Sequence, residues 1–303
     1  MESGKASSEA TQQERTARNA LPGWLPLVVL PVSAVATRNV LPPWAFMWVM
    51  AFAIYAGLKW LTWWQAAWRA EKWRSLAYLL AWPGMDAESF LDATSPAVPV
   101  PGREWLSATL KSVCGACLLW IIARMLPAEL DLERGWVGMV GLILLLHFGT
   151  FHLASLLWRT AGVNAPPIMA APLASTSLAE FWGRRWNLGF RQLAYDLVFR
   201  PLHRRLGPVT ASFLVFVVSG LIHEAVISLP ARAGYGLPTM YFVIQGGGVM
   251  LERSSWGGKL GVQSGARGWL YMAAFTAGPA FWLFHPPFVR SVILPFMQVI
   301  HAL

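Results

Sequence analysis

The chain has 303 residues, of which 56% are hydrophobic and 13% are charged, and its mean hydropathy is +0.47. Soluble domains carry about 25% charged residues. The low charge, with repeated apolar runs of about 20 residues, excludes an ordinary soluble protein and predicts a polytopic membrane protein. The formal net charge of +9 fits loops that face the cytoplasm or anionic headgroups, and no nucleic-acid motif accompanies it.

The expected fold is all-α: an integral membrane bundle of about seven or eight transmembrane helices with interfacial helices beside them. Residues 1–20 are polar and rich in Ser, Glu, Gln and Thr, which is typical of a disordered tail. Basic residues are interspersed there with glutamates, so this segment is not a secretory signal peptide. Residues 21–303 are expected to form a single membrane-embedded domain.

Four spans are predicted in the first half of the chain, over residues 24–37, 43–68, 105–126 and 135–158. The first is short and contains Pro26 and Pro31, which can tilt or break it. The second ends among tryptophans, the usual anchors at a membrane interface. Residues 69–103 are expected to form a connection with a basic cluster, a short interfacial helix and a proline-rich loop.

Cys114 and Cys117 form a C-G-A-C motif inside the third span. Such a pair can bind zinc or do redox chemistry, but a second pair of ligands at metal spacing is missing, so no metal site is predicted. The two cysteines are interpreted as small residues on a helix face. His147 and His152 do not have the four-residue spacing that places side chains on one helix face, and they are interpreted as polar residues of the bundle interior.

Residues 160–208 are too polar for a span and too rich in Trp, Phe and Leu for a simple loop. Ser177, followed three residues later by Glu180, predicts a helix start with a capping box. On a helix that continues from there, Arg184, Asn187 and Arg191 share a face. An amphipathic, membrane-surface pattern follows over residues 190–202, and Pro201 is expected to interrupt it.

Further spans are predicted over residues 209–229, 236–252, 269–288 and 291–303. The three glycines after Gln245 permit a close backbone approach or a break. They are not a phosphate loop, because the required Lys, the Ser/Thr and a preceding strand are missing. The span over 269–288 is interrupted by an H-P-P sequence, and a basic, glycine-rich loop covers residues 254–268.

His223 lies deep inside the span over residues 209–229. Counted from Val209 at about 1.5 Å per residue, it sits roughly 21 Å into a bilayer core of about 30 Å. An ionisable side chain at that depth is a functional-site hypothesis by default; the alternative is a structural histidine that bonds a neighbouring helix. Glu224 follows directly and points about 100° away on a helix, so it need not be the partner of His223.

The sequence F-W-G-R-R-W-N over residues 181–187, followed by S-G-L-I-H-E over residues 219–224, resembles the membrane-bound O-acyltransferase (MBOAT) superfamily, in particular its wax-synthase-like branch. The match covers about residues 170–255. The resemblance implies a polytopic helical fold and transfer of an acyl group from acyl-CoA to a hydroxyl. It places the two signature residues of the family at His223 and Asn187.

Acyl transfer to an alcohol needs a base for the hydroxyl proton, hydrogen-bond donors for the oxyanion and exclusion of water. His223 suits the first role, and Asn187 can either donate to the carbonyl oxygen or accept from the alcohol. The chain has no G-x-S-x-G motif and its cysteines lie in another span, so direct transfer without an acyl-enzyme is expected. Substrate-binding residues are expected to be Trp182, Arg184, Arg185, Trp186 and Arg191.

The basic residues of this region, with Arg204 and Arg205, are suited to the phosphates of CoA; ordinary positive-inside topology is the other explanation. The predicted function is thus an acyltransferase that uses acyl-CoA and a hydrophobic alcohol, without a bound cofactor. Two alternatives stay open: transfer of an acyl or acetyl group to a sterol, diacylglycerol, secondary metabolite or envelope sugar, and a small membrane transporter. Acyl length, acceptor and oligomeric state are not determined by the sequence.

The distribution of Lys and Arg predicts the orientation of this multi-pass protein. The N-terminus, the Arg-rich segment over residues 160–208 and the basic loop over residues 254–268 are expected in the cytoplasm. Arg38, Arg134, Arg232 and Arg290 then fall on the opposite side.

Overall fold

The computed structural model describes residues 21–66 and 70–303. Within these ranges every regular element is a helix and no strand occurs, which confirms the all-α prediction. The predicted tail over residues 1–20 lies outside the described residues, as do Trp68, the last residue of the second predicted span, and Arg69, the first residue of the predicted connection.

Four helical stretches among the described residues are long and apolar enough to cross a bilayer. They are Pro43–Ala66, Gly102–Met125, Asp131–Thr160 and Leu188–Ala231. Such a set is the mark of an integral membrane protein. Other predicted spans correspond to shorter helices, among them α2 (Leu21–Ala36) and α14 (Leu237–Arg253). The count of seven or eight transmembrane helices therefore stays a prediction.

The connection after α3 (Pro43–Ala66) contains the predicted short helix, α4 (Lys72–Ala81), and a second one, α5 (Ala87–Leu91). Arg74 of α4 is buried, and its guanidinium donates to Phe90 O at 3.1 Å. This bond ties α4 to α5, because a buried guanidinium without an acceptor would be costly.

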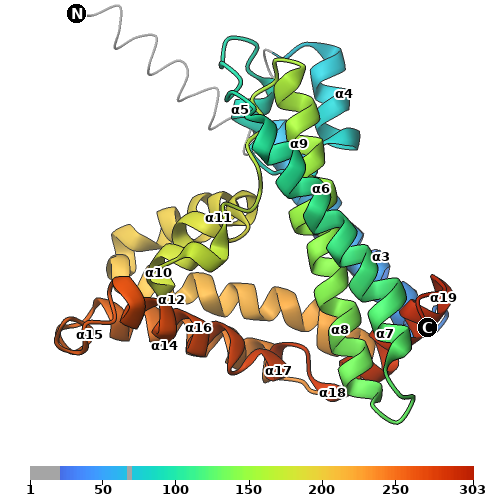
Figure 1. Ribbon diagram of the computed structural model, residues 1–303. Helices are drawn as coiled ribbons and strands as arrows, with labels where there is room; N and C mark the ends of the chain where they lie inside the picture. The colour runs from blue at the N-terminus through green and yellow to red at the C-terminus, as the bar shows by residue number, and fades with distance from the viewer. Residues whose placement is uncertain (1–20, 67–69) are drawn as a thin grey trace, which may run out of the picture.

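Two long rods follow, each a series of α-helical and π-helical turns (Figure 1). They consist of α6 (Gly102–Cys117), η2 (Leu118–Ile122) and α7 (Ala123–Met125), and of α8 (Asp131–Ile143), η3 (Leu144–Thr150) and α9 (Phe151–Thr160). Gly115, between the two free cysteines, brings the rods together. A Cβ at this position would lie 2.5 Å from Leu145 N and 2.7 Å from Gly141 O, so the C-G-A-C motif acts here as a helix contact.

The second half of the chain is a succession of shorter and longer helices around the long helix α12. Its elements are η4 (Pro172–Ala174), α10 (Leu178–Glu180), η5 (Phe181–Arg185), α11 (Leu188–Ala194), η6 (Tyr195–Phe199), α12 (Arg200–His223), η7 (Glu224–Ser228), α13 (Leu229–Ala231), α14, α15 (Ser255–Leu260), α16 (Gly265–Ala277), α17 (Ala280–Leu283), α18 (Pro286–Phe288), η8 (Val289–Ile293) and α19 (Leu294–Val299).

Pro201 was expected to interrupt the amphipathic segment, and this expectation is wrong. Pro201 occupies the first turn of α12, where its missing N–H is not needed. The interruption lies at Gly207, whose φ of 78° is accessible to glycine, and at Pro208 directly after it. The polar start of α12 is thereby set at an angle to its apolar part. The predicted interruption at H-P-P is confirmed: His285 is the N-cap of α18, with Nδ1 accepting from Phe288 N at 3.2 Å.

α12 and α14 run side by side (Figure 1). A Cβ at Gly220 of α12 would lie 2.7 Å from Cα of Thr239 in α14, and a Cβ at Gly246 would lie 3.1 Å from the ring of Phe216. The close backbone approach between these helices is at Gly220, whereas Gly246 and Gly248, after Gln245, make room for the side chains of Phe216 and Phe275. α14 itself stays unbroken.

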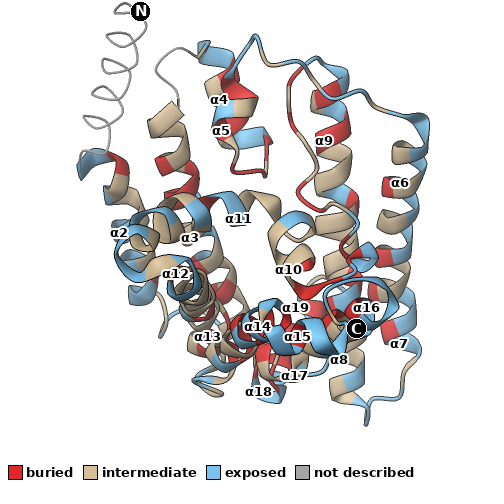
Figure 2. Ribbon diagram, turned by 90° about the vertical axis from the view of Figure 1, so that its left-hand side faces the viewer, coloured by how far each residue is buried: buried red, intermediate tan, exposed pale blue. Residues whose placement is uncertain are grey.

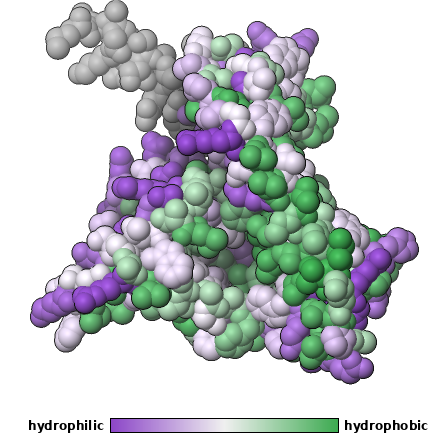
Figure 3. Space-filling model, viewed as in Figure 1, coloured by the Kyte–Doolittle hydropathy of each residue, from purple (hydrophilic) through white to green (hydrophobic). Residues whose placement is uncertain are grey.

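The outer face of α6 is apolar. Leu106, Leu110, Val113 and Ile121 are between 54% and 63% exposed, and their spacing puts them on one side of the helix. Hydrophobic side chains cover the face formed by α6 and α8, while hydrophilic ones gather at the corner that holds α15 (Figure 3). Buried residues instead concentrate where α14, α17 and α18 meet α8 (Figure 2). An exposed apolar band of this kind faces lipid in a membrane protein.

Candidate active site

A cavity of about 630 Å³ lies between α3, η5, α11, η6, α12 and α14. Six of the seven predicted site residues line it: Trp182, Arg184, Trp186, Asn187, Arg191 and His223. The seventh, Arg185, does not. The described residues hold no group of three or more His, Cys, Asp or Glu side chains able to bind a metal ion.

His223 is the last residue of α12, directly before the π-helical turn η7. Its Nδ1 lies 2.7 Å from Ser219 O. Because a carbonyl oxygen only accepts, Nδ1 carries the hydrogen in this bond, and Nε2 of the neutral ring is left with a free lone pair. The ring packs 4.4 Å from that of Phe242. The imidazole is therefore fixed in orientation by one bond and one aromatic contact.

The cavity follows α12 for several turns. Ser212, Phe216, Ser219, His223 and Val226 line it, each three or four residues from the next. From the first to the last of these the helix rises by about 21 Å. The cavity is thus an elongated one in which His223 lies close to one end.

Asn187 departs from the predicted geometry. A continuous helix over residues 177–191 was expected, but the first helix ends at Arg185, and Asn187 adopts the left-handed conformation, with φ 43° and ψ 62°, as the N-cap of α11. Asparagine tolerates this conformation better than most residues. Its side-chain oxygen accepts weakly from Phe190 N, at 3.5 Å. Arg184 and Asn187 consequently reach the cavity from two different helices rather than from one helix face.

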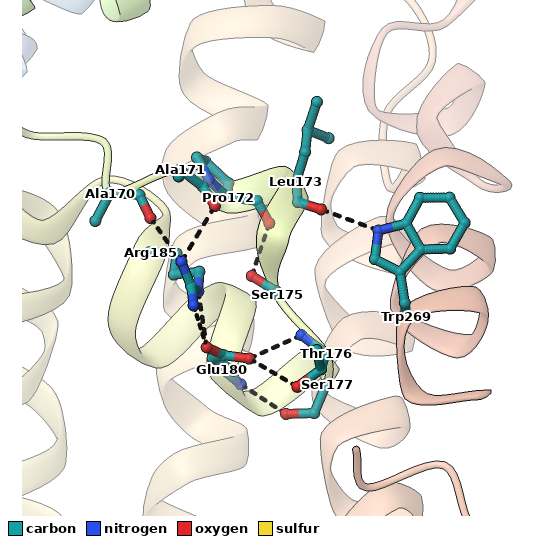
Figure 4. Close-up of polar contacts among 10 residues, drawn as sticks. All are labelled: Ala170, Ala171, Pro172, Leu173, Ser175, Thr176, Ser177, Glu180, Arg185 and Trp269. Atoms are coloured by element: carbon teal, nitrogen blue, oxygen red, sulfur yellow. Dashed lines mark hydrogen bonds and ion pairs between the residues drawn. The ribbon is translucent and has the colours of Figure 1, made fainter. Parts of the chain in front are cut away.

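The predicted capping box at Ser177 is present in modified form (Figure 4). The Ser177 hydroxyl accepts from Glu180 N at 3.1 Å, as expected. The Glu180 carboxylate, however, accepts from Thr176 N at 2.7 Å and from Arg185 Nε at 2.7 Å. These contacts, the Thr176 amide first and the Arg185 guanidinium next, hold the pKa of Glu180 below its usual range.

Arg185 is engaged in holding the chain together. Besides Glu180, its guanidinium donates to Ala170 O at 3.3 Å, and Ala170 N donates to Arg185 O at 2.8 Å (Figure 4). Three residues after Arg185, Leu188 N donates to Ile168 O at 2.9 Å. The segment over residues 168–176 is therefore bound along the stretch that leads to Asn187, and Arg185 acts as a clamp between them.

Two tryptophans form the wall beside η5. Trp182 Nε1 donates to Gln245 Oε1 at 3.2 Å, which satisfies its polar atom, and its ring lies 5.7 Å from that of Phe242. Trp186 stacks on Phe181, with 5.3 Å between the ring centres. Both side chains are positioned by α14 or by their own turn, so the cavity keeps an aromatic wall opposite α12.

Three arginines line the cavity: Arg184 from η5, Arg191 from α11 and Arg253 from the end of α14. All three are exposed, and none forms a hydrogen bond or an ion pair with a described residue. Arg204 and Arg205, also considered for CoA binding, are exposed but lie outside the lining. Sequence reasoning missed Arg253. Its only signal was its place as the first basic residue after the apolar part of α14.

Other titratable residues singled out in the sequence lie elsewhere. Glu224 accepts at 3.0 Å from both the N–H and the hydroxyl of Thr239, outside the cavity lining. His152 Nε2 lies 3.5 Å from Glu104, which also binds Arg159 at 2.7 Å. His147 packs against Phe151, with 5.3 Å between ring centres. Neither histidine is among the cavity-lining residues.

Part of the chain is similar in sequence to known proteins. Residues 165–244 match the family model described as "Membrane bound O-acyl transferase family". The chain is 31% identical over 146 residues to the probable long-chain-alcohol O-fatty-acyltransferase 7 of Arabidopsis thaliana, covering 43% of this chain and 42% of the relative. It is 32% identical over 143 residues to the long-chain-alcohol O-fatty-acyltransferase of Simmondsia chinensis, covering 43% and 40%.

A further relative is the acyl-CoA–sterol O-acyltransferase 1 of Arabidopsis thaliana, with 32% identity over 145 residues, covering 42% of this chain and 40% of the relative. The chain therefore spans about two fifths of the length of these curated relatives. These matches confirm the resemblance to the MBOAT superfamily, and to its wax-synthase-like branch, that residues 181–187 and 219–224 indicated.

The clamp role of Arg185 can be tested by comparing a substitution at Arg185 with the same substitution at Arg184. Arg185→Gln should speed hydrogen–deuterium exchange of the amides over residues 170–176 by about 5-fold, because the loss of a partly exposed, charge-assisted bond costs ~1 kcal/mol. Arg184→Gln removes the same charge one residue away and should leave exchange there unchanged. Equal exchange in both variants, measured by mass spectrometry in the same detergent, would show that Arg185 does not hold this segment.

Proposed function

We propose that this chain is an acyl-CoA-dependent O-acyltransferase that esterifies the hydroxyl of a hydrophobic alcohol. The observation that carries the proposal is the cavity that His223 and Asn187 line together with three arginines, none of which has a hydrogen-bond or ion-pair partner among the described residues. The names of the relatives, which specify long-chain alcohols and a sterol, support an acceptor of this chemical class.

The geometry suits direct transfer. His223 Nε2 removes the proton of the alcohol as its oxygen attacks the thioester carbonyl. The C–S bond of the tetrahedral intermediate then breaks, and the CoA thiolate takes the proton back from the imidazolium. In the neutral ring Ser219 O holds Nδ1–H, so the ring presents its basic nitrogen to the cavity. Asn187 donates its amide N–H to the developing oxyanion.

An acyl-enzyme is not needed. The hydroxyl of Ser219 lines the cavity but donates to Val215 O at 2.9 Å, so its proton is directed at the helix backbone rather than at a base. The aromatic wall of Trp182 and Trp186, together with Phe242, keeps apolar surface around the reacting atoms. Such a wall disfavours water, the competing acceptor.

Incubation of the purified protein with labelled acyl-CoA and a panel of acceptors tests this function. Ester should form with long-chain alcohols, and a preference for sterols, diacylglycerol or polar hydroxyl compounds would instead select the alternative acceptor. His223→Ala should lower turnover by about 100-fold or more, the usual contribution of a general base. Asn187→Asp should not restore the activity that Asn187→Ala loses, because a carboxylate cannot donate to an oxyanion.

All three variants should purify as single, monodisperse species, which separates a loss of chemistry from a loss of folding. Appreciable turnover in His223→Ala would remove the general-base role. No ester from any acceptor in the wild-type protein would refute the proposed function and favour the transporter alternative.

The three cavity arginines are proposed to bind the phosphates of acyl-CoA, since a guanidinium without a protein partner is free to pair with phosphate oxygens. Arg184→Gln and Arg253→Gln should each raise the KM for acyl-CoA by about 5- to 10-fold, or ~1 kcal/mol, and more at low salt. The KM for the alcohol should not change. Arg204→Gln, outside the cavity, is the matched control; an equal rise there would point to a general charge effect instead.

We also propose that the N-terminus and the Arg-rich segment over residues 160–208 face the cytoplasm, as the positive-inside rule predicts. Acyl-CoA has a charged head that does not enter lipid, so the arginines of the cavity must be reachable from that side. In a background without Cys114 and Cys117, cysteines at positions 204 and 232 should react with impermeant reagents from opposite sides. Reaction of both from one side would overturn this orientation.

A further inference from the structure

Lys59 is a buried lysine of the long apolar helix α3 that does not line the cavity. It is 2% exposed, and none of the ion pairs among the described residues involves it. Its Nζ lies 3.3 Å from the centre of the Tyr78 ring and donates to Gly84 O, a carbonyl of the loop over residues 82–86 between α4 and α5. Because a buried amine is costly unless its donors are used, this bond ties the 82–86 loop to α3.

The 82–86 loop is attached to α3 at a second point. Tyr55, four residues before Lys59, donates from its hydroxyl to Trp82 O at 3.3 Å. Tyr55 also lines the cavity. Residues four apart lie on one face of a helix, so the face of α3 that holds the loop also contributes to the cavity wall.

From the 82–86 loop, Met85 contacts α11, the helix whose N-cap is Asn187. Met85 is 3% exposed and belongs with Leu193 of α11 to one buried hydrophobic cluster. A Cβ at Gly189, two residues after Asn187, would lie 3.1 Å from Met85 N, so the backbone of α11 closely approaches that of the loop. The loop that α3 holds therefore supports the start of α11.

We propose that Lys59 is a positioning residue for acyl transfer: by holding Gly84 O it keeps the 82–86 loop against α11 and thereby fixes the position of Asn187. The inference rests on the proposed function, in which the Asn187 amide donates to the oxyanion. The side-chain oxygen of Asn187 is held only weakly, at 3.5 Å from Phe190 N, so its place in the cavity depends on the start of α11. A displacement of about 1 Å in such a group can cost about 100-fold in rate.

Lys59→Met tests this inference, because methionine keeps a long apolar side chain and removes the donor. The substitution should lower turnover by about 10-fold. In an Asn187→Ala background it should lower turnover by less than about 2-fold further, because the residue that Lys59 positions is already gone. A further loss of about 10-fold in that background would mean that the two residues act independently, and would overturn the inference.

Hydrogen–deuterium exchange tests the same link without the reaction. Lys59→Met should speed exchange of the amides over residues 188–191 by about 5-fold or more, because a released loop no longer supports the start of α11. Thr62→Val is the matched control, since it removes the 2.7 Å bond between the Thr62 and Tyr78 hydroxyls, another contact of α3 with α4. None of the hydrogen bonds of Thr62 within the described part of the chain reaches the 82–86 loop. The control should leave both this exchange and turnover unchanged.

Unchanged exchange over residues 188–191 in a folded Lys59→Met variant would refute the positioning role whatever the activity. Equal effects of Lys59→Met and Thr62→Val would indicate a general loosening of α3 against α4 and would refute it as well. If Lys59→Met does not fold, Met85→Ala removes the same support at its contact with α11 and leaves no polar side chain unpaired, so its exchange and turnover decide. Absence of ester with every wild-type pair of substrates would instead refute the proposed function, while the exchange measurement would still test the link between Lys59 and α11.

Discussion

The cavity depends on the attachment of α10 to the end of α14 by the buried carboxylate of Glu252. This side chain is 3% exposed and accepts from Leu178 N at 2.5 Å and from Ala179 N at 3.3 Å. The first amides of a helix have no partner within the helix and carry a partial positive charge, so a carboxylate stabilises them. The stretch from Leu178 to Asn187 begins at this contact. Arg253 is the residue directly after Glu252.

The glycine contacts between α12 and α14 determine where His223 sits. With Gly220 against Thr239 and Gly246 against Phe216, the backbones approach so closely that the two helices have little freedom to slide. Phe242 is thereby brought against the His223 ring. In a bilayer, where apolar side chains gain little by leaving lipid, such close packing is the main source of helix association. The same contacts that hold the bundle therefore orient the imidazole.

The arginines form two groups, according to whether the guanidinium donates hydrogen bonds to oxygens of described residues. Arg74, Arg159 and Arg185 each donate to several oxygens and stabilise loops. Arg184, Arg191 and Arg253 line the cavity and have no such partner among the described residues. A guanidinium already bound to carbonyl and carboxylate oxygens has few donors left for a ligand, whereas an unbound one keeps all five. Neighbouring arginines can thus differ in whether their donors are already used within the protein.

The helical membrane architecture was predictable from the sequence, because long apolar runs with little charge have no other stable conformation in lipid. The start of α10 at Ser177 was predictable for a local reason, since a capping residue acts on amides within one turn. The path from α10 to α11 was not predictable. The chain leaves the helix after Arg185, where Ala170, Met169 and Ile168 of another segment supply hydrogen-bond partners for Arg185 O, Asn187 N and Leu188 N.

His223, Asn187 and Arg184 could be named from the sequence as candidate site residues, and all three line the cavity. The sequence could not show that Arg184 lines the cavity while Arg185 is bonded to other residues, because the two residues are adjacent and identical in chemistry. Only the positions of Glu180 and the carbonyl of Ala170 engage one of them. Arg253 could not be identified from the sequence either. It reaches the same cavity as Arg184 because α10, which leads into η5, is attached to the end of α14, a contact between residues distant in the chain. Local pattern determined the helices and the type of chemistry, and tertiary packing decided which charged side chains face the cavity.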